Sequence, residues 1–146
     1  MKISLTRAFK ERSRLNRKIS ETLALISSEN SMAESSVRSI DVKQKYEEFH
    51  ALCEKLLALK QTISRANAGI SDKLVELSEL KTLLTHLKSI PCSEETQNTY
   101  TSEVKFVAVI KKPQLLEEMA ALQARIDACQ DTIDEFNART RIEFEL

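Results

Sequence analysis

Four basic side chains near the start of the chain recur at a spacing that places them on one face of a helix. They lie three or four residues apart, the spacing at which helix positions stand above one another, and they are Arg7, Lys10, Arg14 and Arg17. Residues 1–28 hold seven basic and two acidic side chains, a local charge of +5. This basic stripe could follow the phosphates of a nucleic acid. It could equally pair with acids of another helix or face solvent.

Three aspartates near the end of the chain are a candidate counterpart. Asp127, Asp131 and Asp134 also share one helical face, and residues 113–146 hold three basic and eight acidic side chains, a local charge of −5. Opposite charges beside apolar seams are typical of neighbouring helices whose charges select partner and direction. Because the chain also has no Trp, we favour pairing of the basic stripe with this acidic stripe, or a solvated face, over nucleic-acid binding.

The cysteines and histidines form no recognisable catalytic or metal-binding pattern. Cys53, Cys92 and Cys129 are too far apart for a metal knuckle or a readable disulfide framework. Cys53 and Cys129 fall on apolar helix phases and are expected to be buried, whereas Cys92 lies in a polar loop and is expected to be exposed. His50 and His86 have no second ligand at helical spacing. We therefore predict no catalytic, cofactor-binding or metal-binding residue.

The sequence contains few residues that interrupt helices, which indicates that long helices carry these side chains. The 146 residues include one Gly and two Pro, the residues that most often interrupt regular structure. Enzymes that bind phosphate through glycine-rich loops, or that turn sharply at a catalytic serine, need several glycines, so those classes are excluded. With 42% hydrophobic and 30% charged residues, the composition suits a helical bundle and is too hydrophobic for a disordered chain.

Apolar residues spaced three and four apart predict long helices. The predicted helices cover residues 4–28, 41–68, 71–89 and 113–137. Ser4 and Asp41 are suitable N-caps for the first two. Gly69 is expected to end the second helix in a left-handed C-terminal cap, and Pro91 to stop the third.

Two segments show features typical of strands. Residues 100–111 are rich in β-branched and aromatic side chains, and apolar and charged residues alternate over 140–146. Two strands alone are marginal in water, so they should pair with each other, pack on helices or extend a sheet of a neighbouring subunit. The predicted fold is mainly α: an antiparallel bundle of four long helices with a small two-stranded β element, in one domain over 1–146.

Three stretches of the sequence resemble, in their residues and spacing, segments of a known family. They are residues 63–68 (ISRANA), residues 100–107 (YTSEVKFV), and Asn137 with Arg139 and Thr140. In order and spacing, from about residue 42 onward, the chain resembles a family of small bacterial helical proteins labelled septicolysin-like. It departs from that family where a longer polar excursion is cut to Gly69-Ile70, and where Ala138 replaces an aromatic residue.

The resemblance implies a helical fold and no residue roles, because the family has no established activity. Its label suggests a cytolysin. Pore formation would call for long amphipathic strands or an apolar helix, and neither is evident in this sequence. Toxin activity is therefore not predicted.

The patterns favour a non-enzymatic function, namely assembly or interaction of a homo-oligomer, a dimer or larger. Long two- or three-helix units leave apolar stripes exposed unless a second chain covers them. The alternative is a nucleic-acid or nucleoprotein binder that uses the basic stripe, and the third hypothesis is an enzyme with a site between subunits. No cofactor is predicted. No membrane partner is predicted, because apolar runs are short. Because the sequence shows no secretory signal pattern, a cytoplasmic location is expected.

Overall fold

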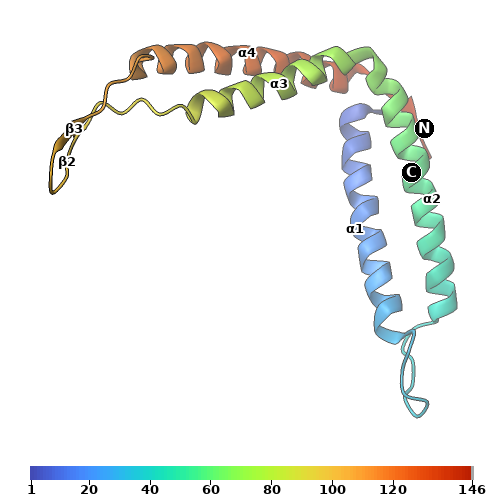
Figure 1. Cartoon of the computed structure of the whole chain (residues 1–146). Helices are drawn as coiled ribbons and strands as arrows, with labels where there is room; N and C mark the ends of the chain where they lie inside the picture. Colours follow the sequence, from blue (N-terminus) through green and yellow to red (C-terminus); the bar gives the residue numbers. More distant parts are fainter. Residues whose placement is uncertain (146) are drawn as a thin grey trace. The chain divides into compact units, whose positions relative to one another are not determined.

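The computed structural model describes residues 1–145 and is mainly helical (Figure 1). The helices are α1 (Leu5–Glu29), α2 (Val42–Asn67), α3 (Ser71–Lys88) and α4 (Lys112–Arg139). The observed helix bounds lie close to those predicted from apolar spacing. Where the sequence suggests one domain over 1–146, the residues group in two compact units. Unit 1 comprises Met1–Gly69 with the residues from Glu135 onward, and unit 2 comprises Ile70–Asp134.

The predicted single two-stranded element is wrong, because the structure has two separate antiparallel sheets. In unit 1, β1 (Lys2–Ser4) pairs with β4 (Arg141–Glu143). In unit 2, β2 (Thr96–Asn98) pairs with β3 (Glu103–Lys105). Each predicted segment thus contains a strand shorter than expected, and each pairs with a segment that sequence reasoning missed. The last predicted strand residue, Leu146, lies outside the described residues.

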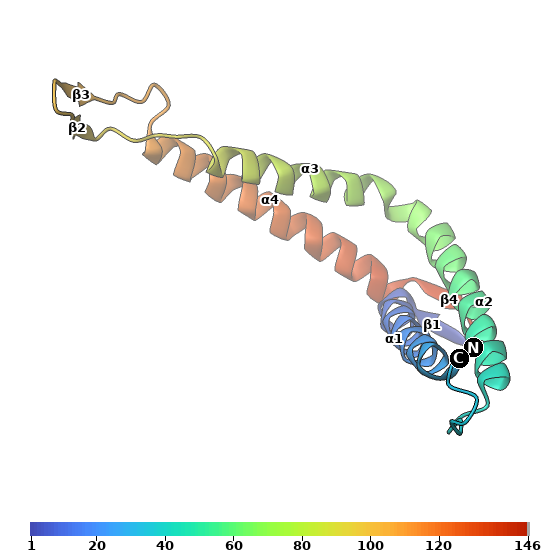
Figure 2. The same cartoon turned by 60° about the horizontal axis from the view of Figure 1, so that its bottom comes forward.

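Helices α1 and α2 lie side by side in both views of unit 1 (Figures 1 and 2). Their facing sides, together with β1 and β4, enclose the core of this unit. The core residues are Ile3, Leu5, Ala8, Leu15, Leu52, Leu59, Ile63 and Ile142. Phe9, Phe136 and Phe144 cover its margins. Burial of these apolar side chains is the main favourable term for folding of the unit.

The β1–β4 sheet brings the two ends of the chain together. Ile3 lies directly opposite Ile142, and both are buried, whereas Lys2 and Glu143 oppose each other and are exposed. The alternation follows from the period of two in a strand, and opposite charges across a pair stabilise it. Leu5 N–H donates to Thr140 O (3.0 Å), which continues the pairing into the first turn of α1.

The two predicted N-caps are confirmed. The side chain of Ser4 accepts a hydrogen bond from Arg7 N (3.2 Å) at the start of α1. Asp41 Oδ1 accepts one from Gln44 N (3.0 Å) at the start of α2. Each cap satisfies a backbone N–H that has no partner within the helix.

Gly69 does not form the left-handed cap that the sequence predicts. It lies in a 3₁₀ turn (Ala68–Ile70), and its φ is not positive. A Cβ at this position would lie 3.3 Å from the ring of Phe136. The absence of a side chain therefore allows the close approach of Phe136, a reason that depends on residues 67 positions apart in the sequence.

In unit 2, α3 and α4 lie side by side (Figures 1 and 2). Leu80 and Leu84 of α3 pack with Leu122 and Ile126 of α4, and Leu77, Leu87 and Met119 lie at the margin of this cluster. Cys129 Sγ donates to Lys73 O (3.3 Å) across the pair. The connection between α3 and α4 carries the β2–β3 hairpin.

Replacement of two leucines that lie two positions apart in α2 should lower the stability of the protein by different amounts. Leu59 is fully buried, whereas Leu57 is 50% exposed. Leu59→Ala should lower the free energy of unfolding by about 2–5 kcal/mol, and Leu57→Ala by less than about 1 kcal/mol. Urea titration followed by circular dichroism measures both. Equal losses would show that the face of α2 packed on α1 is assigned wrongly.

Candidate functional site

The members of the basic stripe share one face of α1, as their spacing predicts, and this face is exposed. All four of its side chains, Arg7, Lys10, Arg14 and Arg17, are exposed. Lys10, Ser13, Arg14 and Arg17 line an open hollow of about 340 Å³. The stripe therefore presents an accessible positive surface in unit 1.

Two members of the basic stripe already have acidic partners on the same helix. Arg14 Nε lies 2.8 Å from Glu11 Oε2, and Arg17 Nε lies 3.7 Å from Glu21 Oε1. These are exposed pairs three and four residues apart, which contribute little to stability. They reduce the positive charge that the stripe can offer to phosphates.

The acidic stripe belongs to α4 and lies in unit 2. Asp127 Oδ1 accepts a hydrogen bond from Gln123 Nε2, and Asp134 Oδ1 accepts one from Gln130 Nε2, both at 2.9 Å. Asp131 is exposed. The two stripes belong to different units, so their pairing, within one chain or between chains, stays a prediction.

A different lysine provides the ion pair between α1 and α2. Lys18 Nζ lies 3.4 Å from Glu48 Oε1, and Lys45 Nζ lies 2.8 Å from Glu48 Oε2. The hydrogen bond from Lys45, with that from Lys18, holds the pKa of Glu48 below its ordinary value of 4.5. The stripe pattern missed Lys18, because its partner is visible only when the register of the two helices is known.

Glu29 organises the loop between α1 and α2. Its carboxylate accepts hydrogen bonds from Ser39 N (2.9 Å), Ile40 N (3.1 Å) and the hydroxyl of Ser39. Arg38 Nε donates to the Glu29 carbonyl (2.9 Å), and Arg38 Nη2 donates to the Asn30 carbonyl (3.2 Å). The last carbonyls of α1 and the end of the loop are thus joined by side chains. The serine-rich composition of 27–39 gives no indication of this clamp.

The clamp predicts a pH-dependent loop. The Ser39 hydroxyl and the backbone N–H groups of Ile40 and Ser39 hold the pKa of Glu29 below 4.5. A lowered folded pKa means that the clamp is complete at neutral pH and is lost as the pH falls through that pKa. In an NMR pH titration, the amides of Ser39 and Ile40 should shift together with the Glu29 carboxylate, at a pH below 4.5.

Two variants separate this effect from general acid unfolding. Glu29→Gln should abolish the step at the Ser39 and Ile40 amides, whereas Glu34→Gln, an exposed residue of the same loop, should leave it intact. A step that survives in Glu29→Gln would contradict the assignment of the clamp.

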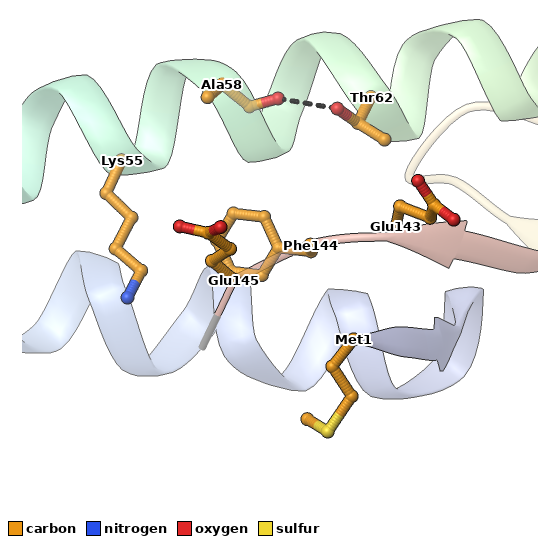
Figure 3. A pocket seen from close by; sticks show the side chains of 7 residues that line it. All are labelled: Met1, Lys55, Ala58, Thr62, Glu143, Phe144 and Glu145. Atoms are coloured by element: carbon orange, nitrogen blue, oxygen red, sulfur yellow. Dashed lines mark hydrogen bonds between the residues drawn. The ribbon is translucent and has the colours of Figure 1, made fainter.

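Another hollow lies in unit 1, beside α2 (Figure 3). Its volume is about 690 Å³, and its lining is Met1, Lys55, Ala58, Thr62, Glu143, Phe144 and Glu145. The Thr62 hydroxyl donates to the Ala58 carbonyl (2.9 Å), and Lys55 Nζ lies 5.7 Å from the centre of the Phe144 ring. Glu143, Glu145 and Lys55 are the groups of the lining that could act as bases, but the Thr62 hydroxyl donates to the Ala58 carbonyl instead of to one of them. The geometry assigns no reaction to this hollow.

The cysteines differ in part from their predicted environments. Cys129 is buried, as predicted, but Cys53 and Cys92 are both half-buried. Cys53 lies beside the stripe of α2 that faces α1 and not within it. Among residues 1–145, no group of three His, Cys, Asp or Glu side chains could hold a metal ion.

Unit 2 exposes most of the large apolar side chains that remain accessible on the described chain. On the helices these are Leu74, Val75, Leu83 and Leu116, and on the connection between them Tyr100, Val104, Phe106, Val107, Val109 and Ile110. Where such side chains form a contiguous patch they mark an interaction site, whereas single exposed side chains are ordinary. Leu74 and Leu116 continue the apolar spacing of their helices, but the packing of α3 on α4 buries a narrower stripe that leaves both exposed.

A groove runs beside the leucine cluster of α3 and α4. One hollow of about 290 Å³ is lined by Leu83, Leu87, Glu118, Ala121, Leu122 and Arg125. A neighbouring hollow of about 410 Å³ shares Leu83 and Arg125 with it. Arg125 Nη2 lies 3.9 Å from Glu76 Oε1, so this cation is held at the edge of the groove. The α3–α4 groove therefore has an apolar floor with charged edges.

Within residues 1–145, no helix combines the length and the apolar character needed to cross a membrane. No family model matches the chain, and no curated protein matches it. Among solved structures, the chain is similar to "a functionally unknown conserved protein from Corynebacterium diphtheriae", with a TM-score of 0.77 and 19% identity over 98% of this chain and 100% of that chain. At this identity the similarity shows a shared fold alone.

Proposed function

We propose that the chain is a non-enzymatic assembly protein, a homo-oligomer in which further copies cover the apolar surface of unit 2. The observation that carries the proposal is the exposure of large apolar side chains on both helices and on the connection of that unit. The antiparallel bundle expected from the sequence is proposed as a property of this assembly. The resemblance to septicolysin-like proteins and a cytoplasmic location accompany the proposal as predictions.

The two units differ in how far their helix pairs are covered by other apolar side chains. In unit 1, β1, β4 and Phe136 add apolar cover to the seam between α1 and α2. In unit 2, the cluster between α3 and α4 has four buried members. Burial of apolar surface contributes roughly 25 cal/mol per Å², so covering the exposed side chains of unit 2 favours association. The α3–α4 groove is a suitable place, because Leu83 lies in its floor at 44% exposure.

The proposal predicts a concentration-dependent assembly. Wild-type protein should sediment as a dimer or larger at micromolar concentration. Leu83→Lys should raise the dissociation constant at least about tenfold, equivalent to about 1.4 kcal/mol, because it places a charge in the apolar floor of the groove. Sedimentation velocity over a range of concentrations measures both proteins.

A control on the same helix isolates the surface. Ser78 is exposed and does not line the α3–α4 groove, so Ser78→Lys should leave assembly unchanged. Circular dichroism checks that both variants keep their helix content. A monomeric wild type would contradict the proposal, and equal behaviour of the two variants would move the contact away from the groove.

The second candidate function is nucleic-acid binding through the basic stripe. One observation favours it: the hollow on α1 is lined only by basic side chains and Ser13. The partial neutralisation of Arg14 and Arg17 by Glu11 and Glu21 weighs against it.

Fluorescence anisotropy with single-stranded RNA and duplex DNA separates the two functions. Our proposal predicts no binding tighter than the non-specific range, about 10⁻⁴–10⁻⁶ M at physiological salt. The comparison is between Lys10→Glu with Arg14→Glu and the matched change of Lys43→Glu with Lys60→Glu, two exposed lysines of α2. Tighter, salt-dependent binding that only the first pair abolishes would establish the basic stripe as a functional surface.

A further inference from the structure

We infer that the free edge of β3 pairs with β3 of a second copy, so that two β2–β3 hairpins form one four-stranded antiparallel sheet. The inference rests on the proposed assembly and names one of its contacts, distinct from the α3–α4 groove. We place the two self-contacts on separate two-fold axes, so that together they form an assembly larger than a dimer, a tetramer where the arrangement closes.

The hydrogen bonds at the two ends of the hairpin determine which backbone groups of β3 face β2. Thr99 N donates to Ser102 O (2.8 Å) at the turn, and Phe106 N donates to Glu95 O (3.1 Å) at the open end. In an antiparallel pair, hydrogen-bonded and non-hydrogen-bonded positions alternate. The pairs Thr99–Ser102 and Glu95–Phe106 are separated by an even number of positions, so one alternation contains both. Every second residue pair between them is therefore hydrogen-bonded.

The unused groups of β3 follow from this alternation. Gln97 and Val104 form a hydrogen-bonded pair, so the N–H and C=O of Val104 are directed at β2. The N–H and C=O of Glu103 and Lys105, one residue to either side, are directed at the opposite edge. Both residues are exposed, and no side-chain, turn or loop hydrogen bond of residues 1–145 engages their N–H groups. Such an edge is a template for another strand.

The charges on this edge select a second copy as its occupant. An antiparallel pairing about a two-fold axis through Val104 places Glu103 of each copy opposite Lys105 of the other. The N–H and C=O groups of Glu103 and Lys105 face the free edge, so these two positions form the hydrogen-bonded pairs between the copies. The same residue pairs therefore carry the backbone hydrogen bonds and the opposite charges. The two-fold axis repeats the arrangement, which gives four backbone hydrogen bonds and two charge pairs. Edge charges of one sign, by contrast, would repel a second copy.

The apolar side chains agree with this pairing. Val104 and Phe106 lie on one face of the hairpin and are 41% and 43% exposed. The two-fold pairing places Val104 beside Val104 of the second copy, and Phe106 of each copy in a diagonal position to it. A continuous apolar patch forms from side chains that are each exposed singly.

A disulfide tests the register directly. Val104 lies on the proposed two-fold axis at a non-hydrogen-bonded position, where opposite Cα atoms are about 4.5 Å apart, within the range that a disulfide spans. Val104→Cys should therefore cross-link most of the protein into covalent dimers under mild oxidation, measured on non-reducing gels. Gln97→Cys, directly opposite Val104 in β2, should cross-link no more than wild type, which carries the same native cysteines.

A proline tests the backbone bonds. Lys105→Pro removes an N–H that faces the free edge of β3, a position at which proline is tolerated. It should lower the mass of the assembled species by about half in sedimentation equilibrium. Thr96→Pro is the matched control, because Thr96 lies opposite Lys105 and its N–H faces the outer edge of β2. This control should keep the wild-type mass.

The outcomes separate this contact from assembly in general. If the wild type assembles but Val104→Cys cross-links no more than Gln97→Cys, the β3 contact is wrong and the proposed function stands. The same holds if Lys105→Pro keeps the wild-type mass. If the wild type is monomeric, both the proposed function and this contact are overturned.

Discussion

Two packed helices can bury only the seam between them, and this constraint determines how much of the apolar surface of the chain is covered. In unit 1, β1, β4 and Phe136 cover further apolar surface of the α1–α2 pair, and Ile3 and Ile142 are part of the core. Unit 2 adds only the β2–β3 hairpin, and Leu83 and Leu116 remain exposed. The unequal cover of the two units is the physical basis for proposing that the chain assembles through unit 2.

The elements set by local sequence could be predicted. The apolar spacing of the helices and the caps at Ser4 and Asp41 depend on residues within a few positions of one another, and the structure has these features. The strands could not be predicted in the same way. Residues 2–4 carry too few apolar side chains to show an alternation, and only the pairing of Ile3 with Ile142 makes them a strand.

The faces and contacts that depend on distant residues were also beyond sequence reasoning. Helix α2 has two adjacent apolar stripes, one with Tyr46 and Cys53 and one with Leu52 and Leu59, and packing on α1 buries the second. Gly69 leaves room for the ring of Phe136, which approaches from α4. The pairs that the basic stripe makes with Glu11 and Glu21 follow from helical spacing, whereas the pair of Lys18 with Glu48 depends on the register of α1 and α2. For unit 2, apolar spacing predicted the helices but not which of their apolar side chains stay exposed.

The central claim is that copies of the chain cover the apolar surface of unit 2. Hydrogen exchange of the intact wild-type protein, compared at concentrations far above and far below the dissociation constant, tests it most directly. The account predicts added protection at high concentration in α3 around Leu83 and at the Glu103 and Lys105 amides, with little change at the loop amides of Ser39 and Ile40. Identical exchange at both concentrations throughout unit 2, or added protection confined to the basic stripe of α1, would contradict it.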